Sequence, residues 1–181
     1  MAEQNEQIVD ELLVMECQDG RVKALDQLVS RWQKRLWRYA YRLTGDLEGA
    51  WDVTQESWLG VIRGLPRLHD PARFRPWIYQ IVTRKAEDWI AGRIKVRRQH
   101  TETGVRAPEP EPLSARVAAD EIRELLDRLP RQSRIILTLR YLENLPIAEI
   151  ACVLGIPEGT VKSRLYAARD ELKALWQQAS E

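Results

Sequence analysis

Apolar residues recur along this chain at steps of three and four positions, and polar residues fill the positions between them. This spacing places apolar side chains on one face of an α-helix, whereas a strand requires alternation at every second position. Strand-like alternation bounded by hairpin turns does not occur in the sequence. The pattern therefore predicts an all-α fold.

Glycine and proline interrupt the helical pattern at intervals, for example at Asp19-Gly20 and at Leu129-Pro130. Both residue types favour the stops and starts of helices over their interiors. The helices predicted between these breaks cover residues 6–17, 21–30, 33–44, 46–63, 74–97, 114–128, 132–143, 147–154 and 158–177.

The segment 99–113, with the sequence QHTETGVRAPEPEPL, differs in composition from the rest of the chain because it is rich in proline and polar residues. Such a segment buries too little apolar surface to offset the entropy cost of ordering it. We interpret it as a flexible linker between two small helical domains, at residues 1–98 and 114–181. Each domain is long enough to enclose a small hydrophobic core.

The overall charge is nearly balanced, with 28 Lys and Arg residues against 27 Asp and Glu residues among 181, but the charges are segregated. Residues 1–19 carry six acidic side chains and no Lys or Arg, whereas residues 93–98 are mostly basic. The hydrophobic content of 44% and charged content of 30% are those of a globular protein. A binding face for a polyanion is therefore compatible with the net charge of +1.

Several classes of protein are disfavoured by what the sequence lacks. Cys17 and Cys152 lie far apart, and the only histidines, His69 and His100, are not paired with a carboxylate in helical register, so we expect no disulfide and no metal site. We expect no cofactor and no enzymatic activity, because no phosphate loop or nucleophile motif occurs. The acidic N-terminus and the absence of an apolar run of about 20 residues favour a cytoplasmic protein without membrane insertion.

Residues 147–165 have the pattern of a helix-turn-helix. Gly155 suits the turn, because glycine adopts the positive φ that a tight helix end requires. The predicted inner faces are Ile147, Ile150, Ala151 and Leu154 on the first helix and Val161, Leu165, Ala168 and Leu172 on the second. The outer face of the second helix would meet the DNA major groove through Glu158, Thr160, Lys162, Ser163, Arg164 and Tyr166. The alternative is a helical hairpin with a solvated polar face.

Other polar and aromatic residues allow two interpretations each. Arg131, Arg134 and Arg140 precede the helix-turn-helix and would either contact phosphates or remain solvated. Asp52, Gln55, Glu56 and Leu59 share one helical stripe, which is either an interface or a solvated acidic face. Six tryptophans lie between residues 32 and 89, and we expect most of them, including Trp77, in the core.

Two blocks of sequence resemble the extracytoplasmic-function sigma factors of the sigma-70 family. LPRQSRIILTLRYLENLPIAEIACVLGIPEGTVKSRLYAARDEL resembles region four of that family. The stripe D-x-x-Q-E-x-x-L and the motif Phe74-Arg75-Pro76-Trp77-Ile78-Tyr79-Gln80-Ile81 are similar to region two. The resemblance covers residues 8–95 and 114–176, in the order that the family has.

The resemblance implies a role for three sets of residues. The minus-thirty-five face would read upstream promoter DNA and comprises Arg131, Arg134, Glu158, Thr160, Lys162, Ser163 and Arg164. The minus-ten surface would hold and melt the second element and comprises His69, Arg73, Arg75, Trp77, Arg84, Lys85, Arg97 and Arg98. The polymerase face would dock on core RNA polymerase and comprises Asp52, Gln55, Glu56 and Leu59. At Arg84 the family commonly has asparagine, and arginine can only donate hydrogen bonds.

The partners that the resemblance implies are core RNA polymerase, promoter DNA and an anti-sigma protein that inhibits the free factor. Inhibition would come from another chain or from packing of the two domains against each other. The main alternative is a helix-turn-helix transcriptional regulator with a helical sensing or dimerisation domain. An α-helical enzyme is a further alternative, but no set of candidate catalytic residues supports it.

Overall fold

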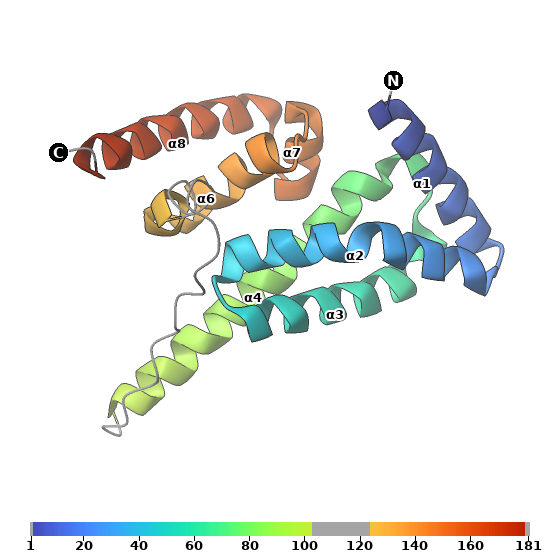
Figure 1. Cartoon of the computed structure of the whole chain (residues 1–181), viewed down its shortest axis with the longest axis horizontal. Helices are drawn as coiled ribbons and strands as arrows, with labels where there is room; N and C mark the ends of the chain where they lie inside the picture. Colours follow the sequence, from blue (N-terminus) through green and yellow to red (C-terminus); the bar gives the residue numbers. More distant parts are fainter. Residues whose placement is uncertain (1, 103–123, 180–181) are drawn as a thin grey trace.

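The computed structural model describes residues 2–102 and 124–179 (Figure 1), with only the backbone described for residues 2–4 and 96–102. All regular elements within these residues are helical, which confirms the predicted all-α fold. No helix among the described residues is long and apolar enough to cross a membrane.

The N-terminal half consists of four long helices and two short 3-10 turns. Figure 1 shows α2 and α3 side by side, with α4 crossing behind them. Large side chains that are fully buried between these helices include Leu28, Leu36, Tyr39, Val53 and Ile78. The elements are α1 (Ala2–Gln18), α2 (Val22–Thr44), α3 (Leu47–Gly64), η1 (Leu65–Arg67), η2 (Pro71–Arg73) and α4 (Phe74–Glu102).

Helix α2 is a single helix, so the prediction of two helices at 21–30 and 33–44 is wrong. The sequence between them contains no glycine or proline, and Leu28, Trp32 and Leu36 continue one buried stripe across the expected break. Helix α4 extends to Glu102, so residues 99–102 of the predicted linker are helical. The rest of that linker lies outside the described residues.

Helix α3 begins at a well-formed cap. The Asp46 carboxylate accepts a hydrogen bond from the Gly49 amide at 2.7 Å and pairs with Arg93 of α4. Burial acts to raise the pKa of Asp46, but the Gly49 amide and the Arg93 guanidinium lower it overall. The cap therefore ties the start of α3 to α4 as well as satisfying its first amide groups.

The C-terminal half contains α6 (Arg131–Leu137), a π-helical turn η3 (Thr138–Leu142), α7 (Ile147–Leu154) and α8 (Glu158–Ala179). Residues 124–128, at the end of the predicted helix 114–128, are helical, and the rest of that helix is outside the described residues. Gly155 ends α7 with a φ of 64°, as the turn chemistry predicted. The helix-turn-helix is therefore present in the structure.

The buried faces of this motif follow the prediction in part: on α8, Leu172 is only half-buried, and on α7 Val153 is buried in place of three predicted residues. Val161, Leu165 and Ala168 are buried under α8. On α7 the buried residues are Ile150 and Val153, whereas Ile147, Ala151 and Leu154 are only half-buried. The difference arises because α7 packs against α4 of the other half as well as against α8.

The two halves lie against each other and share one continuous cluster of buried residues. Helix α7 packs on α4, and α6 reaches α2, as Figure 1 shows. A small void between the halves is lined by Leu43, Ala86 and Ile90 on one side and by Ile135 on the other. Apolar contact therefore contributes to the packing of the halves.

The prediction that most tryptophans lie in the core is confirmed for five of the six. Trp32 and Trp58 are buried, and Trp37, Trp77 and Trp89 are partly buried and pack against the core. Trp51 is the exception because 49% of it is exposed on α3.

Candidate nucleic-acid interface

The second helix of the helix-turn-helix, α8, presents its polar face to solvent. Glu158, Lys162, Ser163 and Arg164 are exposed, and Thr160 is half-buried. Burial of Val161 and Leu165 on the opposite side fixes this orientation. The exposed face has the acceptors, donors and positive charge that can meet base edges and phosphates in a DNA groove.

Two arginines of the minus-thirty-five face are held in contacts within the chain. Arg131 pairs with Glu87 of α4 at 3.4 Å. Arg134 pairs with the Asp127 carboxylate at 3.3 Å and donates to the Asp127 carbonyl at 2.5 Å. Their contact with phosphates stays a prediction, and Arg131 already shares its guanidinium with a carboxylate of the N-terminal half.

The polymerase face on α3 is open to solvent. Asp52, Gln55, Glu56 and Leu59 are all exposed, and Glu56 pairs with Lys85 at 3.1 Å. Trp51 and Ile62 continue the face at both ends, because steps of four, four and three connect positions 51, 55, 59 and 62. An exposed apolar stripe flanked by carboxylates is typical of a protein interface.

Trp51 and Ile62 are additions that the sequence analysis missed. Each has 49% of its surface exposed, although tryptophan and isoleucine usually lie in protein cores. Their position on the same helical stripe as Leu59 was a signal that helical periodicity alone could have detected.

The minus-ten surface follows the loop before α4 and then α4 itself. His69, Arg73 and Arg84 are exposed, whereas Arg75, Trp77 and Lys85 are half-buried. The side chains of the other two predicted members, Arg97 and Arg98, lie outside the described residues.

Helix α7 covers part of this surface. The Arg73 guanidinium contacts the Cys152 sulfur at 3.4 Å, and the Gln80 amide donates to the Cys152 carbonyl at 3.1 Å. Trp77 of α4 and Cys152 of α7 both line one open cleft of about 260 Å³. Trp77, a planar side chain that could support an unstacked base, therefore faces a cleft that α7 bounds.

Arg84 lies in a second cleft between the halves. This cleft, of about 210 Å³, is lined by Arg84 and Glu87 of α4, by Val153 and Leu154 of α7, and by Arg164 of α8. Arg84 and Arg164 were predicted to contact two different promoter elements. The structure instead places them on the same cleft.

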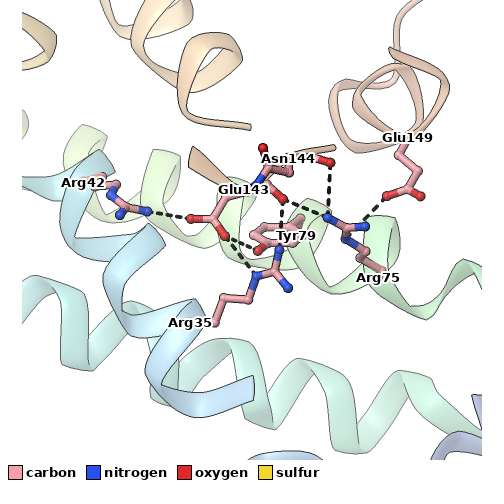
Figure 2. A network of polar contacts seen from close by, with 7 residues as sticks. All are labelled: Arg35, Arg42, Arg75, Tyr79, Glu143, Asn144 and Glu149. Carbon is pink, nitrogen blue, oxygen red and sulfur yellow. Dashed lines mark hydrogen bonds and ion pairs between the residues drawn. The ribbon is translucent and has the colours of Figure 1, made fainter. Parts of the chain in front are cut away.

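The best-connected polar group between the halves is the carboxylate of Glu143, just after η3 (Figure 2). It receives Nε of Arg35 at 3.1 Å, a terminal nitrogen of Arg42 at 2.6 Å, and the hydroxyl of Tyr79. Glu143 itself is 2% exposed. Burial, followed by the negative charge of Glu143, raises the pKa of Tyr79, so its hydroxyl stays protonated and donates.

The backbone beside this carboxylate is engaged as well. Arg75 donates to the Glu143 carbonyl at 2.8 Å and pairs with Glu149 of α7 at 3.7 Å. Asn144 has a φ of 54°, a left-handed conformation that asparagine tolerates better than most residues. Figure 2 shows that Arg35, Arg42 and Arg75 all converge on this short segment.

No motif or periodicity in the sequence marks Glu143, Arg35, Arg42 or Glu149 as functional residues. Arg35 and Arg42 are two helical turns apart and share a face, which was the only local signal. Their partner lies 108 and 101 positions further along the chain, so no local pattern connects them. Tyr79, which belongs to the motif that resembles region two, is fully buried.

No group of three or more His, Cys, Asp or Glu residues in the described part of the chain could hold a metal ion. Cys17 and Cys152 are both free thiols. The site consists instead of charged and aromatic side chains, which suits the recognition of macromolecules.

Comparison with known proteins identifies both halves. The family described as Sigma-70 region 2 matches residues 28–95, and the family described as Sigma-70, region 4 matches residues 119–172. The chain is 32% identical over 155 residues to the ECF RNA polymerase sigma factor SigE of Mycolicibacterium smegmatis, with 82% of this chain and 60% of that protein covered. It is 29% identical over 183 residues to the ECF RNA polymerase sigma-E factor of Salmonella typhimurium, with 93% and 94% covered.

Two solved structures share the fold. One is that of CnrH in complex with the cytosolic domain of CnrY, with a TM-score of 0.71 and 24% identity, covering 94% of this chain and 98% of that chain. The other is that of the sigma factor RpoE in complex with the anti-sigma factor NepR from Bartonella quintana, with a TM-score of 0.71 and 20% identity, covering 86% and 98%.

Proposed function

The chain belongs to the extracytoplasmic-function sigma factors of the sigma-70 family, and we propose that it binds core RNA polymerase and directs transcription initiation at specific promoters. The observation that carries this proposal is the presence of both sigma regions in one chain, each with its expected face built on helices. A helix-turn-helix regulator with a sensing domain is not favoured, because the N-terminal half matches a sigma region.

We assign region 2 to residues 1–98, a linker to residues 99–113 and region 4 to residues 114–181. In this division α8 of region 4 reads the minus-thirty-five element through its exposed face. Region 2 and region 4 each bind DNA weakly, and polymerase holds them at the spacing of the two elements. The second contact then becomes effectively intramolecular, which raises the affinity without new contacts.

The minus-ten surface melts and holds the second element. Bases that leave a duplex must be stacked on planar groups or captured in pockets, and their phosphates need cations along the path. Arg73 at the end of η2 and Arg84 and Lys85 on α4 supply such cations. Arg84 replaces the asparagine that is common in the family, so base preference at this position should differ from that of relatives with asparagine.

The polymerase face of α3 docks on the core enzyme. Its carboxylates offer acceptors to arginines of a partner, while Leu59 supplies apolar area. Trp51 and Ile62 extend the apolar part of this face and enlarge the surface available for docking.

The remaining features follow from this role. A sigma factor works where polymerase and the chromosome are, so we place the protein in the cytoplasm, without membrane insertion. It acts by binding, with no catalytic chemistry of its own. An anti-sigma protein is proposed as a further partner that would occlude these faces in the free factor.

In vitro transcription with core polymerase on a library of genomic fragments tests the function. Initiation at a defined set of start sites that depends on this chain is the expected result. DNA binding without such initiation would instead favour the helix-turn-helix regulator.

A further inference from the structure

We propose that Glu143 is an internal latch that holds region 4 over the minus-ten surface in the free protein. The latch comprises the Glu143 carboxylate and its three partners in the N-terminal half, Arg35, Arg42 and Tyr79. The functional meaning of the latch rests on the proposed role as a sigma factor. Its existence can be tested on the free chain without polymerase.

The first argument is the burial of charge. The Glu143 side chain is 3% exposed, whereas those of Arg35 and Arg42 remain 35% and 31% exposed. A buried carboxylate is costly unless donors compensate for the lost water. Its described side-chain partners all come from α2 and α4, so only the closed arrangement of the halves compensates it.

The second argument is the set of contacts that the backbone carbonyls of Glu143 and Asn144 make. Arg75 donates to the carbonyls of Glu143 at 2.8 Å and of Asn144 at 3.4 Å. Arg75 belongs to the minus-ten surface. The two carbonyls therefore engage a guanidinium that promoter phosphates would otherwise bind. Arginine guanidinium groups bind phosphates in the same way as carboxylates, so the position of the Glu143 carboxylate could also hold a DNA phosphate.

The third argument is which faces stay open. The polymerase face on α3 and the outer face of α8 are exposed, whereas on the minus-ten surface α7 contacts Arg73 and Arg75 and bounds the cleft that Trp77 lines. The closed protein can therefore meet polymerase before it can hold a melted element. Docking on polymerase and opening of the latch become successive steps.

The partial exposure of the two arginines makes opening of the latch feasible. Arg35 and Arg42 already face water in part, so they can be rehydrated when Glu143 leaves. Promoter phosphates and acidic side chains of a partner can then replace the carboxylate, because the same guanidinium groups bind them.

Energy transfer between two dyes tests the latch on the free protein. The dyes are placed on Lys23→Cys in α2 and Lys173→Cys in α8, both exposed positions, in a chain with Cys17→Ser and Cys152→Ser. The labelled protein with unchanged latch residues should give a single population with high energy transfer between the two dyes. Glu143→Lys puts a cation against Arg35 and Arg42 and should raise the ratio of open to closed protein by about tenfold or more.

Two further variants keep the test independent of folding. Arg42→Glu should open the protein from the other side, and combining it with Glu143→Lys should restore transfer toward the original value, because the charge pair is rebuilt in reverse. Glu16→Lys, which breaks the surface pair with Arg21 on the N-terminal half, is the matched control and should leave transfer unchanged.

The outcomes separate the latch from the sigma function. Unchanged transfer in both Glu143→Lys and Arg42→Glu, with helical content retained by circular dichroism, would overturn the latch even if the chain initiates transcription. Opened variants in a chain that never initiates transcription would leave the latch in place and refute the proposed function. Opened variants that bind a single-stranded minus-ten oligonucleotide about tenfold more tightly would support both.

Discussion

At the scale of single residues, the start of α3 and the outer face of α8 show how one side chain combines two tasks. Asp46 caps the Gly49 amide and also pairs with Arg93. Arg164 belongs to the predicted minus-thirty-five face and also lines the cleft that contains Arg84. In both cases one task is local to the helix, and the packing of helices or halves adds the second.

Substitution of Asp46 should separate its two tasks. Asp46→Ala removes the cap and the ion pair and should cost about 1 kcal/mol or more of unfolding free energy. Asp46→Asn keeps an acceptor for Gly49 and should cost less. Urea unfolding of both variants beside the parent protein measures the difference.

The amount by which aspartate at position 46 raises the unfolding free energy relative to asparagine, its advantage at this cap, should also depend on pH. The folded state lowers the pKa of Asp46, so the advantage is fully present above the ordinary Asp value of about 4. It is lost as the pH falls through the lower folded value. A difference between the two proteins that grew toward acid pH would contradict this assignment.

On α8, Lys162→Ala should weaken binding to the upstream promoter DNA and reduce the slope of log affinity against log salt by about 1. Lys173→Ala removes the same charge further along the same helix, away from the helix-turn-helix, and serves as the control. Equal effects of both substitutions would remove Lys162 from the DNA interface.

At the scale of elements, α3 presents opposite faces to different partners. One face carries Asp52, Glu56 and Leu59 to solvent, and the other packs against α2 and α4. Gly49 lies on the packed face, where a Cβ atom would overlap the Trp89 ring of α4. The exposed face can therefore change charge with little effect on folding, whereas the packed face cannot gain volume.

Charge reversal on the exposed face, with Asp52→Lys and Glu56→Lys together, should weaken association with core polymerase by about tenfold or more while the protein stays folded. Asp19→Lys with Asp26→Lys reverses two exposed carboxylates elsewhere in the N-terminal half and provides the control. Titration of labelled protein with core enzyme measures both. Equal affinity of the two double variants would refute the docking role of α3.

Enlarging the packed face should destabilise the N-terminal half. Gly49→Ala should cost about 1–3 kcal/mol of unfolding free energy, because the added methyl group must displace Trp89. Gly92→Ala on α4 meets open space and should instead be neutral or stabilising by up to about 1 kcal/mol. Chemical denaturation that found the two substitutions equivalent would contradict this packing.

At the scale of the whole molecule, apolar and ionic contacts join the two halves. The buried cluster is continuous across them, and Glu143 adds a compensated charge at the boundary. Such coupling makes the halves unfold together as long as the interface is intact. Its strength also sets how readily the factor opens.

Calorimetry should show one unfolding transition for the parent protein. Glu143→Ala leaves the buried Tyr79 hydroxyl without its acceptor and takes the shared carboxylate from two partly exposed arginines, which should cost about 1–3 kcal/mol. The transition should then divide into two or move to lower temperature. A single transition at the original temperature would show that the halves hold together without the latch.

The sequence by itself determined the local features of this protein. Periodicity predicted helices, turn chemistry predicted the left-handed Gly155, and spacing predicted which side chains share the outer faces of α3 and α8. These features depend on residues a few positions apart, whose geometry a helix fixes. The false break in α2 was placed where the sequence has no glycine or proline to stop a helix.

The arrangement of the halves was decided only by the tertiary structure. Glu143 lies 108 positions from Arg35 and 64 from Tyr79, and no helical period or turn motif relates such distant residues. Burial of Val153 beneath α7, with Leu154 only half-buried, depends in the same way on α4. Contacts of this kind depend on how whole helices pack, because the free energy of burying a carboxylate is set by the donors that the fold brings to it.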